Sequence, residues 1–309
     1  MRAACTAGTI RDSSPPPHPG VLGESALSPL STSSAGQAVS TELAPKQLTL
    51  IGPGGEPVSA KVIDVGEGRP IVFLHGLVGL NDHWEEVVRR CCHRLRASLL
   101  EIPLLSLRGD DCSIIGVEAL TARFLEQHFG GSGGPAPILV GNSFGGHVAL
   151  RLALNRPDLV SGLVLAGASG LIEKTMVADV QIRPSREWLR RKIGELFYDP
   201  ATHMKEADLD RAHKELSNRG GARAMVKLSR SARRNHLGDR IPEIQAPTLL
   251  IWGKQDIVTP PEAADQFMSL LRDARIVWFD DCGHAPMIEK PAEFAQALLD
   301  FATELDRRG

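Results

Sequence analysis

The chain has 309 residues and a formal net charge of −2, with 42% hydrophobic and 23% charged residues. This composition is typical of a soluble globular protein with one large domain or two ordinary ones. The near-neutral charge argues against a global attraction to nucleic acid or to an anionic membrane, and it favours a small-molecule substrate. Because no run of about 18 consecutive apolar residues occurs, we expect no membrane-spanning segment.

Residues 1–45 are rich in Ser, Pro and Gly and show no hydrophobic period, so we expect a disordered N-terminal extension. A secretory signal is not expected, because no apolar stretch of about 7 to 15 residues follows Arg2. A transit peptide and a mispredicted start codon are the alternative explanations of this segment.

From residue 46 onward, β-rich segments alternate with amphipathic ones. The first two, QLTLI and SAKVIDV, are joined by the turn-forming GPGGEP and predict a hairpin. Helical patterns between most later strands predict an α/β fold with a mostly parallel, eight-stranded sheet. Six strands are nearly continuous apolar runs, as expected for strands covered on both faces: 70–75, 97–102, 137–141, 162–167, 247–252 and 275–280.

Ser143 lies in the stretch GNSFG, between a predicted strand and a helix that we expect to begin near His147. In the pattern G-x-S-x-G, a tight strand-to-helix turn strains the serine backbone and exposes its hydroxyl, and small neighbours avoid clashes across the turn. The helix N-terminus adds a positive dipole and free N–H groups. Ser143 is therefore the candidate nucleophile.

The gap between the strands at 162–167 and 247–252 is too long for one crossover and contains several helical patterns. We therefore predict a helical cap at residues 169–240, inserted between strands six and seven. The core domain would consist of residues 46–168 and 241–309.

The predicted cap contains two groups of side chains with two possible roles each. A run of cations at helical spacing predicts a solvated basic face, and the alternative is a surface that attracts carboxylate substrates; it comprises Arg219, Arg223, Lys227 and Arg230, with Arg233, Arg234 and Arg240 following. Large apolar residues either pack the cap's own core or line an acyl or aryl pocket: Trp188, Phe197, Met176 and Met225.

A nucleophilic serine needs a base and an acid later in the chain. Asp256 follows the strand at 247–252, and His284 follows the strand at 275–280. Both therefore fall at the same edge of a parallel sheet as Ser143, where ligands collect. Asp280 and Asp281 lie nearer to the histidine in sequence, but acids in that position more often cap a loop, and we favour Asp256.

The cysteines and remaining histidines predict no metal site. Five cysteines occur, and the adjacent pair Cys91 and Cys92 fits neither a C-x-x-C motif nor zinc-ligand spacing. We expect reduced, mostly buried thiols and a cytoplasmic location. Other histidines, including His83 and His147, lack metal-ligand spacing and are interpreted as surface or packing residues.

The order Ser143, Asp256, His284 and the contexts of these residues resemble the α/β-hydrolase family. Four motifs carry the resemblance, which covers residues 47–305: F-L-H-G at 73–76, G-N-S-F-G-G at 141–146, W-G-x-x-D-x-x-x-P at 252–260 and C-G-H-A-P at 282–286. The resemblance implies that the three residues form a nucleophile, orienter and base triad. It also implies an oxyanion hole formed by the N–H groups of Leu77 and Phe144, with His75 shaping the loop.

The resemblance implies hydrolysis of a small to medium carboxylic ester through an acyl-enzyme on Ser143, with no metal or cofactor. The serine excludes close similarity to dehalogenases and epoxide hydrolases, which carry aspartate there. The Ser143 motif also resembles the carbon–carbon hydrolases of meta-cleavage products, although many of those have Trp where this chain has Ala285. An acyltransferase and a ligand receptor with a vestigial triad are less favoured alternatives.

Residues 101–113 depart from the pattern common in the family after its fourth strand. Arg108 and Asp110 in this segment either border the pocket or, as we favour, belong to an exposed polar loop. No motif indicates the physiological substrate or the oligomeric state.

Overall fold

The computed structural model describes residues 44–79, 81–131, 133–171 and 184–308. Within these ranges eight strands form one sheet in the order β1-β2-β4-β3-β5-β6-β7-β8. β2 pairs antiparallel with β1 and β4, and the other neighbours are parallel. The predicted hairpin and mostly parallel sheet are therefore confirmed. The strands are β1 (Lys46–Ile51), β2 (Pro57–Val65), β3 (Arg69–Leu74), β4 (Leu95–Glu101), β5 (Ile138–Asn142), β6 (Gly162–Ala166), β7 (Thr248–Gly253) and β8 (Ala274–Phe279).

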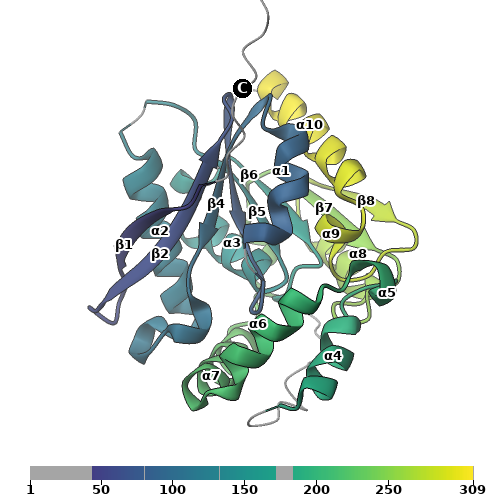
Figure 1. Ribbon diagram of the computed structural model, residues 1–309. Helices are drawn as coiled ribbons and strands as arrows, with labels where there is room; N and C mark the ends of the chain where they lie inside the picture. Colours follow the sequence, from purple (N-terminus) through teal and green to yellow (C-terminus); the bar gives the residue numbers. More distant parts are fainter. Residues whose placement is uncertain (1–43, 80, 132, 172–183, 309) are drawn as a thin grey trace, which may run out of the picture. The chain divides into compact units, whose positions relative to one another are not determined.

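Helices cover both faces of the sheet (Figure 1). One face carries α1 (Glu85–Cys91) and α10 (Pro291–Arg308), and the other carries α2 (Ile114–Phe129), α3 (Phe144–Asn155) and α8 (Pro261–Leu270). Short helices of three or four residues lie at Asn81–Trp84, Leu104–Ser106, Gly109–Asp111, Pro157–Leu159, Ile241–Glu243 and Pro286–Glu289, the last of which is α9.

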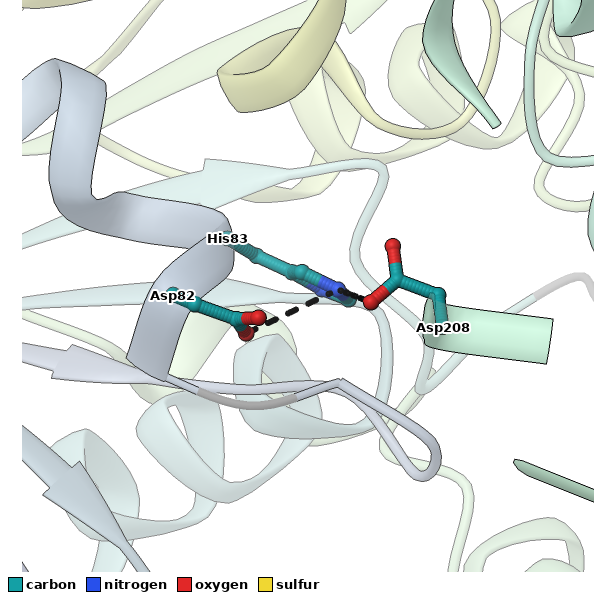
Figure 2. A group of neighbouring side chains, drawn as sticks. All are labelled: Asp82, His83 and Asp208. Atoms are coloured by element: carbon teal, nitrogen blue, oxygen red, sulfur yellow. Dashed lines mark ion pairs between the residues drawn. The ribbon is translucent and has the colours of Figure 1, made fainter. Parts of the chain in front are cut away.

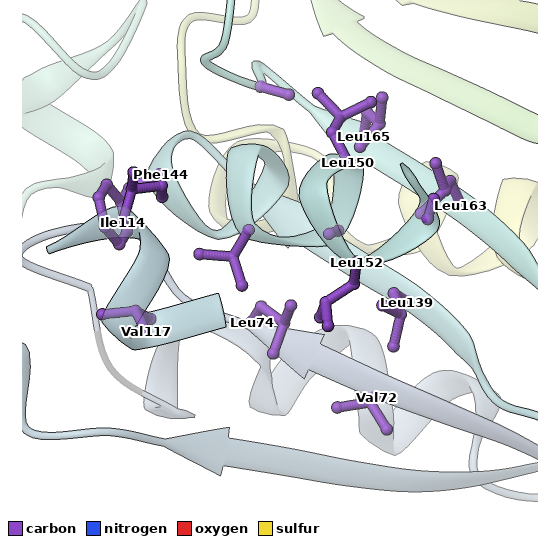
Figure 3. Packing of buried hydrophobic residues seen from close by; sticks show 14 of the residues in the cluster. Val72, Leu74, Ile114, Val117, Leu139, Phe144, Leu150, Leu152, Leu163 and Leu165 are labelled. Atoms are coloured by element: carbon purple, nitrogen blue, oxygen red, sulfur yellow. The ribbon is translucent and has the colours of Figure 1, made fainter. Parts of the chain in front are cut away.

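The central strand β3 shows why the strands are apolar without interruption. Ile71 and Phe73 belong to the core under α1 and α10, whereas Val72 and Leu74 belong to the core under α2 and α3, which Figure 3 shows. Because successive side chains of a strand point to opposite faces, a strand with helices on both sides needs apolar residues at every position. The edge strand β8 is only half-buried over most of its length.

In the described part of the connection from β6 to β7, four α-helices precede the short helix Ile241–Glu243: α4 (Arg186–Gly194), α5 (Pro200–His203), α6 (Glu206–Ser217) and α7 (Arg219–Arg234). They lie together at one end of the sheet (Figure 1), and we call residues 184–240 the helical insertion. Asn218 separates α6 from α7, and its side chain accepts a hydrogen bond from Gly221 N. These helices lie between strands six and seven, and a separate cap domain at residues 169–240 stays a prediction.

Several further predictions concern the chain as a whole. No helix in the described ranges is long and apolar enough to cross a membrane. The four described cysteines are free thiols. The predictions for residues 1–43 and for Met176 lie outside the described residues.

Candidate active site

Ser143 is the single residue between the end of β5 and the start of α3, which begins at Phe144 rather than near His147 as predicted. Its backbone has φ 53° and ψ −118°, a region that side-chain-bearing residues rarely adopt. Hydrogen bonds hold the turn in place: Ser143 N donates to Ala166 O at 3.1 Å, and Ser143 O accepts from Ser169 N at 3.0 Å. The predicted strained turn is therefore observed.

Three glycines around Ser143 show why the motif requires small residues. A Cβ atom on Gly141 would lie 2.5 Å from the backbone of Gly145, and a Cβ on Gly145 would lie 2.3 Å from Leu74 O. A Cβ on Gly146 would lie 2.5 Å from Cβ of Ala168. Any larger residue at these positions would displace α3 from the sheet, and with it the Ser143 turn.

Asp256 and His284 lie in the loops after β7 and β8, and they form a buried pair. His284 Nδ1 lies 2.9 Å from Asp256 Oδ2. The other carboxylate oxygen of Asp256 accepts hydrogen bonds from Val258 N at 2.8 Å and from Thr259 N at 2.9 Å. These donors orient the carboxyl group so that Oδ2 faces Nδ1, and in the tautomer protonated at Nδ1 the Nε2 atom is the one left to act as a base.

The side chain of Thr259 contacts both residues of this pair. Its hydroxyl oxygen lies 2.8 Å from Asp256 Oδ2, 3.0 Å from Gly167 O and 3.1 Å from His284 Nδ1. A hydroxyl has one proton, so it donates to one of the two oxygens at a time. Thr259 is fully buried, which confines both partners to a fixed geometry.

Asn142 connects the Ser143 turn to residues 280–285, which we call the His284 loop. Its Nδ2 donates to Ala166 O at 2.9 Å and to His284 O at 3.0 Å. Both protons of this buried amide are therefore used, and the backbone of His284 is fixed relative to the residue next to Ser143.

The two rival acids point elsewhere. Asp280 is exposed and forms an ion pair with Lys254 at 2.7 Å. Asp281 is exposed as well, and its φ of 49° marks a tight turn. The geometry therefore favours Asp256 as the partner of His284.

Ser143 and His284 line one cavity of about 170 Å³. Its remaining wall is mostly apolar and comes largely from the helical insertion, including Trp188, Phe197 and Met225. These three were candidates for a pocket wall, and the structure places them there.

Leu77 and Phe144 line the same cavity. A Cβ added to Gly76 would lie 3.5 Å from Cβ of Ser143, so the loop after β3 lies directly against the Ser143 turn. The structure thus brings together Ser143, His284 and both residues predicted to supply oxyanion N–H groups, with Asp256 behind the histidine.

Three other residues singled out in the sequence lie outside the cavity wall. His75 is buried with Nδ1 2.8 Å from Gly76 O, and burial lowers its pKa, as expected for a loop-shaping residue. Arg108 and Asp110 are exposed, and the Arg108 guanidinium donates to Leu107 O at 2.7 Å. Arg108 and Asp110 are therefore exposed polar residues, as we favoured, although apolar residues of the same segment, such as Leu105 and Leu107, are buried.

The sequence did not single out a polar cluster at the cavity, shown in Figure 2. His83 and Asp208 both line the cavity, and His83 Nε2 lies 3.7 Å from Asp208 Oδ1 and 3.9 Å from Asp82 Oδ1. Arg211 donates to Asp208 at 2.7 Å and to Asp82 at 3.3 Å. The cluster connects two elements that are more than 120 residues apart in the sequence, namely the short helix Asn81–Trp84 and α6.

The ligand atoms of Asp82, His83 and Asp208 lie within 4.8 Å of one another, which is close enough to hold a cation. The guanidinium of Arg211 already donates to both carboxylates and supplies the positive charge. His83 and Arg211 hold the pKa of the Asp208 carboxyl below its usual range. We therefore interpret the cluster as an ion-pair network between the core and the helical insertion.

A model of the alpha/beta hydrolase family matches residues 71–297. The chain therefore belongs to the alpha/beta hydrolase family.

Two relatives of the chain are named for different reactions. The chain is 29% identical over 279 residues to a 2-hydroxy-6-oxononadienedioate/2-hydroxy-6-oxononatrienedioate hydrolase of Paraburkholderia phymatum, covering 84% of this chain and 96% of the relative. It is 26% identical over 253 residues to a pimeloyl-[acyl-carrier protein] methyl ester esterase of Nitrosomonas europaea, covering 78% and 98%. A solved structure, the alpha/beta hydrolase MGS-MChE2 from a sediment metagenome of the Mar Chica lagoon, Morocco, has a TM-score of 0.61 and 31% identity over 80% of this chain and 96% of that chain.

Proposed function

We propose that the protein is a serine hydrolase that cleaves a small to medium carboxylic ester through an acyl-enzyme on Ser143. The observation that carries this proposal is the strained Ser143 turn in one apolar cavity with His284, whose Nδ1 lies 2.9 Å from Asp256. A nucleophile, a base and an orienting acid are the groups that acyl transfer requires.

In the first half of the reaction, His284 Nε2 takes the proton of Ser143 as Oγ bonds to the ester carbonyl carbon. The N–H groups of Leu77 and Phe144 donate to the resulting oxyanion. The bond to the leaving oxygen then breaks, and the alcohol departs with the proton from His284. In the second half, His284 takes a proton from water, the water oxygen attacks the acyl carbon, and the acid leaves as Ser143 regains its proton.

The composition of the cavity wall favours a substrate with an uncharged acyl group. The described residues of the wall are predominantly apolar, and each buried methylene of a substrate contributes about 0.8 kcal/mol. The volume of about 170 Å³ favours acyl groups of short to medium length over long-chain triglycerides.

A second candidate is hydrolysis of a carbon–carbon bond in a meta-cleavage-type diketo acid. The named relative of Paraburkholderia phymatum favours it. Such a substrate carries a carboxylate, which needs a cationic or hydrogen-bonding partner when buried. Among the described residues of the wall, the basic side chains other than His284 are Lys192 and His83, and Lys192 lies 2.9 Å from Glu195.

A panel of p-nitrophenyl esters from acetate to palmitate, run beside a meta-cleavage diketo acid, tests the two candidates. We expect kcat/KM to rise over the first few carbons and then to fall where the acyl chain reaches the cavity wall. Ser143→Ala is the control, and it should lower turnover by about 10⁶-fold. If the diketo acid exceeds every ester by more than about a hundredfold, the second candidate replaces the first.

A further inference from the structure

A buried carboxylate, Glu289, lies at the end of α9 behind the His284 loop. Its Oε1 accepts a hydrogen bond from Gly283 N at 2.7 Å, and its Oε2 accepts one from Tyr198 N at 2.8 Å. Gly283 immediately precedes His284, and Tyr198 belongs to the helical insertion. One side chain therefore binds the backbone of two segments that come from different parts of the chain.

Backbone contacts bring the same two segments together directly. His284 N donates to Leu196 O at 2.8 Å. A Cβ atom on Gly283 would lie 2.9 Å from both Leu196 O and Tyr198 N, so only glycine fits this approach. Leu196 and Phe197 also line the cavity. The segment that walls the cavity is thus in contact with the backbone of the histidine.

Backbone N–H groups are the main partners of the Glu289 carboxyl oxygens, and the Cys282 thiol adds a weak contact to Oε1 at 3.8 Å. Within the described ranges no Lys or Arg forms an ion pair with it, and only 7% of the residue is exposed. Burying a carboxylate in this way is costly unless its lone pairs are satisfied, and charge-assisted bonds from two backbone N–H groups satisfy them. Neither N–H donor would have this partner if an apolar side chain replaced Glu289.

We propose that Glu289 is a positioning residue that couples the helical insertion to His284. Asn142 holds the His284 backbone to the Ser143 turn, and Glu289 holds the preceding residue to the cavity wall. The insertion therefore contributes, together with Asn142 and Asp256, to the placement of His284 relative to Ser143. The inference rests on the proposed function, because it takes His284 as the base.

Glu289→Gln tests the coupling, and Glu293→Gln is the matched control. The glutamine has the same size but turns an N–H₂ group toward one of the two backbone donors, whereas Glu293 is exposed near the start of α10. We expect Glu289→Gln to lower kcat on the preferred ester by about 10- to 100-fold with KM changed less than about threefold, since a displaced catalytic group costs rate rather than binding. Labelling of Ser143 by a fluorophosphonate should slow in parallel.

Hydrogen exchange gives a readout that does not require turnover. In Glu289→Gln the amides of residues 196–198 and 282–284 should both exchange faster, while Glu293→Gln leaves them unchanged. If Glu289→Gln fails to fold, Glu289→Asp, which keeps the charge on a shorter side chain, should give the same pattern.

Three results would overturn the inference. One is wild-type kcat and labelling rate in folded Glu289→Gln; another is faster exchange in only one of the two segments. The third is a wild-type protein that neither turns over substrate nor reacts with the fluorophosphonate. That outcome refutes the proposed function as well, whereas the first two leave it intact.

Discussion

His284 Nδ1 lies 2.9 Å from Asp256 Oδ2, although Asp280 is much nearer to the histidine in sequence. We expect Asp256→Asn to lower kcat by about 10⁴-fold, because the amide favours the wrong tautomer of the histidine. Asp280→Asn is the matched control and should change kcat less than about tenfold, since Asp280 pairs with Lys254 at the surface. Steady-state kinetics on one ester ranks the two variants, and the opposite ranking would move the acid to the His284 loop.

Trp188 on α4 lines the cavity, so its size should set the longest acyl chain that fits. Trp188→Ala is expected to move the optimum of kcat/KM toward longer p-nitrophenyl esters by a few carbons, with a gain of about 0.8 kcal/mol for each methylene that becomes buried. Arg191→Ala, on the exposed side of the same helix, should leave the optimum in place. An unchanged chain-length profile in Trp188→Ala would show that another wall limits the substrate.

His147 is fully buried in α3, with Nε2 3.0 Å from Asn235 O, and burial lowers its pKa from 6.5 to about 4. At a pH between these two pKa values, His147 binds a proton in the unfolded chain but not in the folded protein. The free energy of unfolding should therefore fall as the pH drops from about 6.5 to about 4, by roughly 3 kcal/mol, and this loss should be complete below pH 4.

Urea unfolding of the wild type and of His147→Gln between pH 7 and pH 4 measures this contribution. Glutamine can still donate to Asn235 O but does not titrate, so the variant should lose less stability over the same window. Equal pH dependence in the two proteins would mean that His147 is not the titrating group.

Asp208 has a pKa held below its usual range by His83 and Arg211. A carboxyl group whose pKa is lowered by folding stabilises the folded protein, and the full effect is present above its pKa in the unfolded chain, about 3.9. The stabilisation is lost as the pH falls through the pKa of the group in the folded protein. At pH 7, Asp208→Asn should therefore lower the free energy of unfolding by about 1 kcal/mol, since the pair with Arg211 is partly screened by solvent. The difference from wild type should shrink below about pH 4. Chemical denaturation at pH 7, 5 and 3.5 checks this, and a constant difference would contradict it.

The features that could be predicted from the sequence are those that depend on residues close together in the chain. The strands were recognisable from uninterrupted apolar runs, and the Ser143 turn from glycines that leave no room for a side chain. Asp256 and His284 could be paired because both follow parallel strands and therefore reach the same edge.

The residues that escaped prediction act through contacts between distant segments. Glu289 was not distinguishable from any other acid near a helix, since its partners are backbone N–H groups of Gly283 and Tyr198. His83 and Asp208 meet only because α6 is placed against the segment before α1. Neither spacing nor hydrophobic period encodes such contacts, which depend on how the helical insertion packs.

The bond from His284 N to Leu196 O has a kinetic consequence. Main-chain atoms form it, so truncating a side chain of the cavity wall leaves it in place, whereas a movement of the helical insertion away from the core would break it. If product leaves by such a movement, the open conformation lacks this hydrogen bond, and the chemical step and product release take place in different conformations. If reclosure is the slow step, kcat should fall as solvent viscosity rises, while the rate of the chemical step in a pre-formed complex stays constant.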